Sequence, residues 1–381
     1  MFDQALEISL KDTRVISRID PPEAPEIATL FRLSDGKILL GFELEGPATG
    51  YPSVWNNLLV KAGSWLKSLD GGNTWFFSHF DYGYVRAPIF QFDDGEIILF
   101  IQDCLVRTSG EVFTFCQRST DNGQTFKDCE EALISLPKDL VKTDETKEPW
   151  VQPHPPHPTP GRRRTEFFMN RSIIQLTDGD LLASLRGAFI GDRNWRNVLI
   201  TSSDRGSSWS YLSTIAADPQ APPEVRGKAH YEGFDEAAIA VLPDGELLTV
   251  MRTGSGLPLY QSRSVDGGET WSTPVRSGGK GVYPELLLMS SGILACSYGR
   301  VKHPPSTGAE LIFSTDLGAT WGNRTVIYDE PCEAYTAMLE VNPGELLFLY
   351  DTRASDPRVS NQAKSPSPNC IMAVNVEVKS R

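Results

Sequence analysis

One short motif recurs five times along this chain of 381 residues. Its pattern is S-x-D-x-G-x-[ST]-[WF], and the copies begin at Ser68, Ser119, Ser202, Ser264 and Ser314. The Asp carboxylate can accept hydrogen bonds from backbone N–H groups of a tight turn, and the Gly permits a positive φ. The final aromatic residue can pack back onto a sheet. The motif therefore predicts repeated units of β-strands joined by this turn.

A second repeat alternates with the first, and each copy is a hairpin turn followed by an apolar strand. Its six copies carry the glycines Gly36, Gly95, Gly179, Gly245, Gly292 and Gly344. A four-stranded unit needs about 40–50 residues, so the chain accommodates six units with insertions. We predict an all-β fold, a single six-bladed β-propeller domain that spans residues 1–381. The C-terminal segment CIMAVNVEV and the N-terminal segment ALEISL are expected to close the sixth unit together.

The largest insertion is expected at about residues 127–166, between the second and third units. It contains the segment EPWVQPHPPHPTPGRRRT, whose prolines are expected to exclude regular structure. Two arrangements fit this segment. It is an extended surface loop, or it folds over the mouth of the propeller and brings His154, His157 and residues 162–164 near a ligand.

Composition excludes several classes of function. The net charge of −13 argues against nucleic acid as a partner, because phosphate binding needs a basic surface. No run of 18 apolar residues exists that could span a membrane, and the N-terminus lacks a signal peptide, so the protein stays in the cell or a leader has been removed. The six cysteines show no C-x-x-C pair, so we expect no metal and free thiols, with a Cys104–Cys116 disulfide as the alternative.

The hairpin glycines supply a common register for the six units. Nine residues before the glycine, units two to six have Arg86, Asn170, Glu236, Tyr283 and Tyr335, and unit one has Glu26 beside that place. Seven residues after the glycine lie Glu43, Gln102, Arg186, Arg252, Gly299 and Asp351. The first strand of each propeller blade lines the central channel, so we expect these mostly polar residues to converge on one mouth. Such convergence is what a binding or catalytic site requires.

Glu236 and Tyr335 form a specific chemical pair within this set. A phenol has a pKa of about 10 and is a poor nucleophile alone. A carboxylate within hydrogen-bond reach can take its proton as it attacks. A neutral phenol also avoids repulsion by a substrate whose reacting carbon bears a carboxylate. Such a substrate needs arginines, whose planar fork binds a carboxylate in two places, and the set offers Arg252, Arg86 and Arg186.

At these positions the sequence resembles the sialidase (neuraminidase) superfamily, and the resemblance covers nearly the whole chain. The segment FDEAAIAVLPDGELLTVMR is similar to the one that carries the catalytic Glu and one arginine of a carboxylate-binding triad, here Glu236 and Arg252. The segment EAYTAMLEVNPGELLFLYD is similar to the one that carries the nucleophilic tyrosine, here Tyr335. The five Asp-turn motifs look like Asp-boxes, which implies a structural, peripheral role for Asp70, Asp121, Asp204, Asp266 and Asp316.

The sequence departs from the sialidase pattern at three places. Glu26 stands where the first triad arginine is expected, and Tyr283 lies where the third is expected. No Asp or Glu occurs from Gly46 to Leu69, where the usual acid lies. We therefore expect Arg86, Arg186 and Arg300 to replace the lost arginines. The proton is expected to come from Glu26, Glu43 or Asp103.

These observations predict a sialidase-like exo-glycoside hydrolase that acts without a cofactor on a terminal acidic sugar of a carbohydrate substrate. Tyr335 is the expected nucleophile and Glu236 its base. The expected substrate-binding residues are Arg252, Arg86, Arg186, Glu26, Tyr283, Asn170, Arg300 and Tyr298. Three alternatives remain: a glycosidase for a non-sialic sugar, a uronate lyase, and a carbohydrate-binding propeller without catalysis. The lyase would take its base from His79, His230 or Tyr298.

Overall fold

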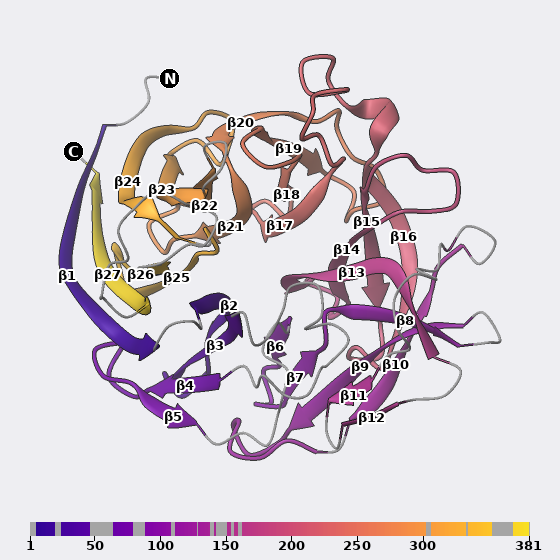
Figure 1. Ribbon diagram of the computed structural model, residues 1–381, viewed down its shortest axis with the longest axis horizontal. Helices are drawn as coiled ribbons and strands as arrows, with labels where there is room; N and C mark the ends of the chain where they lie inside the picture. The colour runs from indigo at the N-terminus through magenta and orange to yellow at the C-terminus, as the bar shows by residue number, and fades with distance from the viewer. Residues whose placement is uncertain are drawn as a thin grey trace.

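The computed structural model of the protein is all-β (Figure 1). It describes residues 5–19, 24–45, 64–78, 88–107, 111–127, 129–137, 141, 151–153, 156–158, 162–301, 306–332, 334–352 and 369–380. Within these ranges the one helix is the short 3-10 helix Asp218–Gln220, and all other regular structure is strand. No helix in this part of the chain is long and apolar enough to cross a membrane.

Three sheets of four antiparallel strands follow the order of the sequence. Their strands are β2 (Ala24–Arg32), β3 (Ile38–Glu45), β4 (Ser64–Ser68) and β5 (Phe76–Ser78); β17 (Asp235–Val241), β18 (Leu247–Arg252), β19 (Pro258–Ser264) and β20 (Val275–Lys280); and β21 (Val282–Leu288), β22 (Leu294–Val301), β23 (Ser306–Ser314) and β24 (Gly322–Pro331). Figure 1 shows the sheets around a common centre, with the first strand of each of these three nearest to it.

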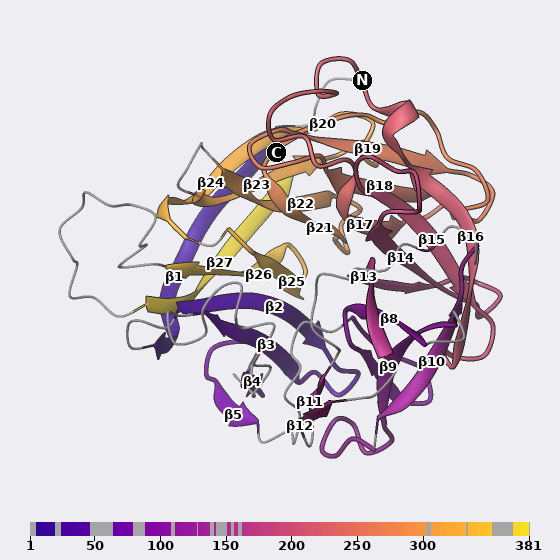
Figure 2. The ribbon, with the colours of Figure 1, turned by 45° about the vertical axis from the view of Figure 1, so that its right-hand side comes forward.

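A fourth four-stranded sheet joins the two ends of the chain. Its order is β1-β27-β26-β25, with the strands β1 (Leu6–Ile19), β25 (Ala337–Asn342), β26 (Glu345–Thr352) and β27 (Asn369–Ser380). The N-terminal strand pairs antiparallel with the C-terminal strand, from Leu6 opposite Ser380 to Ile19 opposite Asn369. Figures 1 and 2 both show β1 along the outer side of β27. The predicted closure by the two termini is therefore confirmed.

The remaining long sheet has nine strands in the order β10-β16-β15-β14-β13-β8-β9-β7-β6. They are β6 (Ile89–Gln91), β7 (Ile97–Phe100), β8 (Asp103–Arg107), β9 (Val112–Ser119), β10 (Glu130–Ser135), β13 (Arg162–Gln175), β14 (Leu181–Gly187), β15 (Arg196–Ser202) and β16 (Ser208–Ala216). Strand β10 pairs antiparallel with β9 on one side. On its other side it pairs parallel with β16 over three residue pairs, so it links the strands β6 to β9 with the strands β13 to β16.

The proline-rich insertion is more regular than its sequence predicts. Strands β11 (Val151–Pro153) and β12 (Pro156–Pro158) form a two-stranded antiparallel hairpin, and β13 begins soon after it at Arg162. The prediction that these prolines exclude regular structure is therefore wrong. A two-stranded ribbon has two edges, and proline is tolerated where no backbone donor is needed. His154 lies outside the described residues, as do the side chains of His157 and of residues 162–164.

The Asp-turns make the hydrogen bonds that their sequence predicts. In the first copy the Asp70 carboxylate accepts bonds from the Thr74 N–H at 2.8 Å and the Thr74 hydroxyl at 2.6 Å. The Ser68 hydroxyl donates to Asp70 and accepts from the Gly72 N–H, both at 2.8 Å. The other four copies repeat this pattern with their own residues. Each turn is thus satisfied locally and fixes the link between two strands.

Apolar side chains fill the space between neighbouring sheets. An example is the edge-to-face pair Phe100 and Trp209, whose ring centroids lie 5.6 Å apart and whose side chains are both buried. All six cysteines are free thiols, so the alternative of a Cys104–Cys116 disulfide does not hold. The sheets are therefore held by packing and hydrogen bonds, and this rigid frame positions the polar residues near the centre.

Candidate active site

Glu236 lies at the middle of a hydrogen-bonded cluster of side chains from three sheets. Its Oε1 accepts from Arg252 Nη1 at 2.9 Å, from the Tyr335 hydroxyl at 3.1 Å and from Arg186 Nη1 at 3.3 Å. Its Oε2 accepts from the backbone N–H of Tyr283 at 2.8 Å. Five residues singled out from the sequence therefore meet here, although Glu236 and Tyr335 are 99 positions apart.

Two irregular strand starts aim side chains into this cluster. The pairing of β17 with β18 shifts register after Asp235, and the pairing of β21 with β22 shifts register after Val282. Glu236 and Tyr283 lie at these shifts with φ of 42° and 50°. A positive φ costs a non-glycine residue on the order of 1–3 kcal/mol and is concentrated at functional sites. Such β-bulges turn side chains away from the regular alternation of a strand.

Tyr335 is positioned by a close backbone contact at Gly299. A Cβ added at Gly299 would lie 1.9 Å from the carbonyl oxygen of Ala334, the residue before Tyr335. Ala334 itself has a φ of 72°. The phenol ring then packs edge-on against Tyr283, with 4.1 Å between ring centroids. Gly299, the one non-polar member of the predicted second set, therefore lets the Tyr335 segment approach the centre.

Asp235 belongs to the cluster, and the sequence analysis missed it. Its Oδ1 accepts the Glu236 backbone N–H at 2.7 Å and lies 3.0 Å from Arg186 Nη1. The side chain is fully buried. Asp235 thus supports both the strained backbone of Glu236 and the guanidinium of Arg186. The segment FDEAAI shows two adjacent acidic residues, Asp235 and Glu236. Counting nine residues back from the hairpin glycine selects only the second of them.

Arg171 is a second residue that the sequence analysis missed. Its Nη1 donates to the Thr336 carbonyl at 2.9 Å and lies 3.2 Å from Glu285 Oε2. Its guanidinium stacks on the Tyr283 ring, 3.7 Å from the centroid. The glycine register selected Asn170 because it assumes a regular strand, whereas β13 shifts register between Met169 and Ile173.

Three arginines near Glu236 have buried N–H groups without a hydrogen-bond partner among the described residues. These are the Nε of Arg171, Arg186 and Arg252, and also Nη2 of Arg171. Buried donors are nearly always paired in folded proteins. Guanidinium donors in particular form strong, charge-assisted bonds to carboxylates. These N–H groups are therefore unsatisfied donors of the cluster, and they are closed to solvent in this structure.

Burial and nearby charges shift the pKa values of the adjacent carboxylates Asp235 and Glu236 in opposite directions. Burial raises the pKa of Asp235 more than Arg186 lowers it, and the Glu236 carboxylate adds to the rise. Burial also opposes ionisation of Glu236, but Arg252 and Arg186 outweigh it and hold the pKa of Glu236 below its usual value. Glu236 is therefore a carboxylate at neutral pH, the form that can accept the proton of Tyr335.

Asn170 and Glu26 have buried positions in the sheets. The Asn170 amide donates to Ser184 Oγ and to Asn197 Oδ1, both at 2.9 Å, so its contacts tie β13 to β14 and β15. Glu26 is buried on β2 and pairs in register with Glu43 on β3. The structure does not place the Asn170 amide among the bonds of the Glu236 cluster, because a buried amide needs partners of its own.

Tyr298 and Arg300 belong to a second charged group, on β22 and β23. The Tyr298 hydroxyl donates to Glu310 at 2.8 Å, and the Tyr298 side chain is 1% exposed. Arg300 Nε lies 3.3 Å from Glu310, and Arg300 also pairs with Asp329. These contacts hold neighbouring strands of one sheet together. Tyr298 and Arg300 thus share the carboxylate of Glu310 and not that of Glu236.

Four further residues were predicted as candidates for the site. Arg86 and His79 lie outside the described residues. Asp103 is buried at the start of β8, and His230 is exposed on the connection between β16 and β17.

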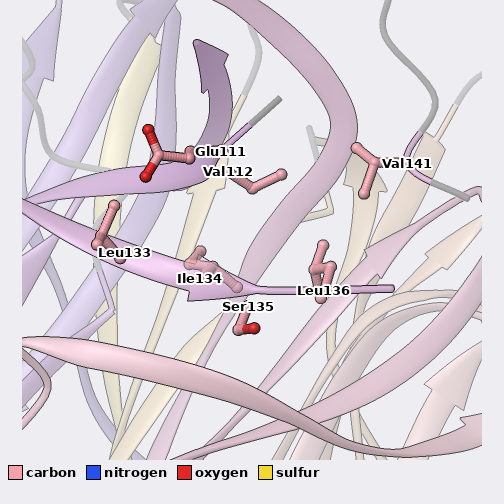
Figure 3. A pocket seen from close by; sticks show the side chains of 7 residues that line it. All are labelled: Glu111, Val112, Leu133, Ile134, Ser135, Leu136 and Val141. Carbon is pink, nitrogen blue, oxygen red and sulfur yellow. The ribbon is translucent and has the colours of Figure 1, made fainter. Parts of the chain in front are cut away.

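A cavity of about 190 Å³ lies away from this cluster, beside β9 and β10 (Figure 3). Its lining is mostly apolar and comprises Glu111, Val112, Leu133, Ile134, Ser135, Leu136 and Val141. Glu111 is ion-paired with Arg107 at 3.2 Å. This cavity holds no group of acids, bases or arginines like that around Glu236, so the chemistry points to the central cluster.

The fold is shared with solved structures of several proteins. A protein of unknown function from Dyadobacter fermentans has a TM-score of 0.64 at 18% identity, over 98% of this chain and 99% of that one. The K499G mutant of the NanB sialidase from Streptococcus pneumoniae has a TM-score of 0.59 at 13% identity, over 95% and 70%. The α-L-arabinanase of Penicillium chrysogenum has 0.56 at 14%, over 98% of both chains. The chain therefore has the all-β fold that sialidases and arabinanases share.

The family described as a BNR repeat-like domain matches residues 84–278, more than half of the chain. The chain therefore belongs to this family. Among curated proteins, none matches the sequence.

Proposed function

We propose that this protein is a glycoside hydrolase that removes a terminal acidic sugar, with Tyr335 as nucleophile and Glu236 as its base. The observation that carries the proposal is the 3.1 Å hydrogen bond from the Tyr335 hydroxyl to Glu236, within a cluster of arginines. A phenol becomes a competent nucleophile when a carboxylate takes its proton during attack. The same bond orients the phenol oxygen before substrate arrives.

The arginines favour an acidic substrate. Arg171, Arg186 and Arg252 approach Glu236 or Tyr283 from β13, β14 and β18, and each has a buried N–H group without a partner in the described structure. A carboxylate on the sugar would satisfy these donors once neighbouring side chains move to admit it, because the donors are closed to solvent in this structure. A carboxylate bound there would also compete with Glu236 for the hydrogen bonds and positive charge of Arg186 and Arg252. The basicity of Glu236 then rises at the moment when it must accept a proton.

The comparisons support this proposal at the level of fold. Two of the similar structures are a sialidase and an α-L-arabinanase, which are named for an acidic and a neutral sugar respectively. The arginines around Glu236 favour the acidic sugar, because a neutral sugar would leave their donors unpaired. The acidic sugar is therefore the better fit to the site.

The proposal includes a propeller of six blades. Five blades are marked by Asp-turns, and the sheet of β25, β26, β27 and β1 makes the sixth. This count divides the nine-stranded sheet into β6 to β10 and β13 to β16. The parallel pairing of β10 with β16 then joins two neighbouring blades at their outer strands.

The test is hydrolysis of aryl glycosides of N-acetylneuraminic acid, deaminated neuraminic acid, glucuronic acid, rhamnose and arabinose. We expect turnover of an acidic glycoside. Tyr335→Phe is expected to lower kcat about a thousandfold or more, because no other group replaces the nucleophile. The control is Tyr211→Phe, which removes a hydroxyl hydrogen-bonded to nearby Thr214 on β16 and should leave kcat unchanged. Full activity of Tyr335→Phe would contradict the role of Tyr335 as nucleophile. Hydrolysis of the arabinoside alone would contradict an acidic sugar as the substrate.

A further inference from the structure

Glu232 is an acid at the rim of the cluster that the mechanism above does not use. Its Oε2 lies 2.8 Å from Arg252 Nη2, while Arg252 Nη1 lies 2.9 Å from Glu236 Oε1. One guanidinium therefore joins the two carboxylates. The Glu232 side chain is 38% exposed, against 3% for Glu236. Of these two carboxylates, Glu232 is the one that can exchange protons with water.

The backbone holds Glu232 in a fixed place. Its N–H donates to the Thr253 carbonyl at 3.0 Å, and its carbonyl accepts from the Trp195 N–H at 2.9 Å. The next residue, Gly233, has a φ of 104°, and a Cβ there would lie 2.1 Å from the Trp195 carbonyl oxygen. The segment is thus bonded on two sides and packed directly against neighbouring backbone. A catalytic group needs this kind of rigid support.

The charges around Glu232 favour protonation when an anionic substrate binds. Burial raises the pKa of Glu232 against the effect of Arg252, and the carboxylates of Asp235 and Glu236 add to the rise. A substrate carboxylate that binds Arg252 would take over the cation that stabilises ionised Glu232. The proton-bearing form of Glu232 is then favoured further. An acid catalyst must carry its proton in the complex with substrate.

We propose that Glu232 is the acid–base residue of the reaction, an inference that rests on the function proposed above. In the first step Glu232 gives its proton to the glycosidic oxygen as the bond from that oxygen to the anomeric carbon breaks. The Tyr335 oxygen bonds to the anomeric carbon, and its proton passes to Glu236. In the second step the Glu232 carboxylate takes a proton from water, whose oxygen bonds to the anomeric carbon. The bond from that carbon to Tyr335 breaks, and Tyr335 recovers its proton from Glu236.

This assignment differs from the acids expected from the sequence, which were Glu26, Glu43 and Asp103. Glu232 reaches the site from the connection before β17, which also leads into the strand of Glu236. One segment of chain therefore supplies both carboxylates of the mechanism. Arg252, on the next strand, contacts both.

The test compares Glu232→Gln with wild type on two substrates of the acidic sugar that wild type hydrolyses. One is the glycosyl fluoride, whose leaving group needs no proton, and the other is the methyl glycoside, whose leaving group does. We expect kcat/KM of the variant to fall at least about a hundredfold on the methyl glycoside and less than about tenfold on the fluoride. Glu224→Gln is the matched control, because Glu224 lies on the same connection and also contacts an arginine, Arg276, at 3.4 Å. The control should match wild type on both substrates.

Each other outcome overturns the assignment. Equal losses on the two substrates would show that Glu232 only positions Arg252, and no loss would show that it has no role. If wild type hydrolyses neither substrate of any sugar in the panel, the proposed function itself fails, and Glu232 fails with it. Circular dichroism of each variant checks that it is folded. A second readout is Glu232→Ala with sodium azide, which should form a glycosyl azide and regain rate on the fluoride.

Discussion

Gly299 on β22 and Ala334 before β25 are in direct backbone contact. A Cβ on Gly299 would lie 1.9 Å from the Ala334 carbonyl oxygen and 2.3 Å from the Ala334 Cβ. No rotation of a side chain can relieve such an overlap, because backbone atoms form it. The contact sets the distance between two neighbouring sheets at the point where Tyr335 begins. The position of the proposed nucleophile thus depends on the absence of a side chain on another sheet.

Gly299→Ala is expected to displace Tyr335 from Glu236. We expect kcat to fall about tenfold to a hundredfold, because a shift of about 1 Å in a reacting group costs this much. The measurement is steady-state kinetics together with thermal unfolding. Gly292→Ala is the control, since Gly292 has a φ of 83° but open space around it, and should lose about 1 kcal/mol of stability with kcat unchanged. Wild-type kcat in folded Gly299→Ala contradicts the positioning role.

Arg171→Lys is expected to weaken binding of an acidic substrate. Lysine keeps the positive charge but lacks the planar guanidinium that stacks on the Tyr283 ring. It also lacks the Nε and Nη2 donors, which have no hydrogen-bond partner among the described residues. A hydrogen bond to a charged group is worth about 1.5–3 kcal/mol, so KM should rise about tenfold to a hundredfold. The control is Arg324→Lys, whose guanidinium bonds Glu310 in the separate charged group. An unchanged KM in Arg171→Lys would remove Arg171 from the anion site.

The Asp-turns predict a loss of stability in acid. Hydrogen bonds from the Thr hydroxyl and backbone of each turn lower the pKa of Asp70, Asp121 and Asp266 to about 2. The unfolded value is about 3.9, so these carboxylates stabilise the fold above about pH 4, and this stabilisation is lost as pH falls from about 4 to 2. We expect Tm to fall through that window. The double variant Asp70→Asn, Asp121→Asn should show a weaker dependence of Tm on pH.

The control for the acid experiment is Asp178→Asn. Asp178 lies in a hairpin turn outside the Asp-turn motif and accepts one bond, from the Asp180 N–H at 3.1 Å. Its variant should follow wild type between pH 6 and 2. An equal slope for the double variant and wild type would show that the Asp-turns do not cause the acid sensitivity.

Arg14 on β1 is expected to stabilise the closure of the ring. Its Nε and Nη2 donate to the Gly72 carbonyl of the first Asp-turn, at 3.2 and 2.5 Å, and its Nη1 donates to Asn375 at 2.8 Å. Arg14→Ala should lower the free energy of unfolding by about 1–3 kcal/mol, because three charge-assisted hydrogen bonds are lost. The Gly72 carbonyl then keeps only the Trp75 indole N–H as a side-chain donor among the described residues, at 3.0 Å. Denaturant unfolding measures this. Arg18→Ala, on the exposed part of the same strand, should change stability by less than about 0.5 kcal/mol.

The meeting of Glu236 with Tyr335 could be predicted because regular hairpins repeat the same spacing. Each hairpin glycine marks a turn, and strands of similar length bring equivalent residues to the same end of their sheets. The same count also placed Arg186 and Arg252 correctly beside Glu236. The count found Glu236 and Tyr283 although both lie at register shifts, but it failed at two other positions. It chose Asn170 where the shift in β13 brings Arg171 into the site, and it passed over Asp235.

The sequence by itself determined the all-β class, the five Asp-turns and the pairing of the two termini. The first two depend on turn chemistry and on alternation within a few residues, which are local in the chain. The pairing of the termini is a long-range contact, and it was inferred because the sixth repeat lacks an Asp-turn of its own. Only the tertiary structure decided which polar groups share hydrogen bonds. The contact of Gly299 with Ala334, the stacking of Arg171 on Tyr283 and the ion pair of Glu232 with Arg252 join separate segments. Such contacts depend on bulges and on the spacing between sheets, and the packing of the whole ring sets both.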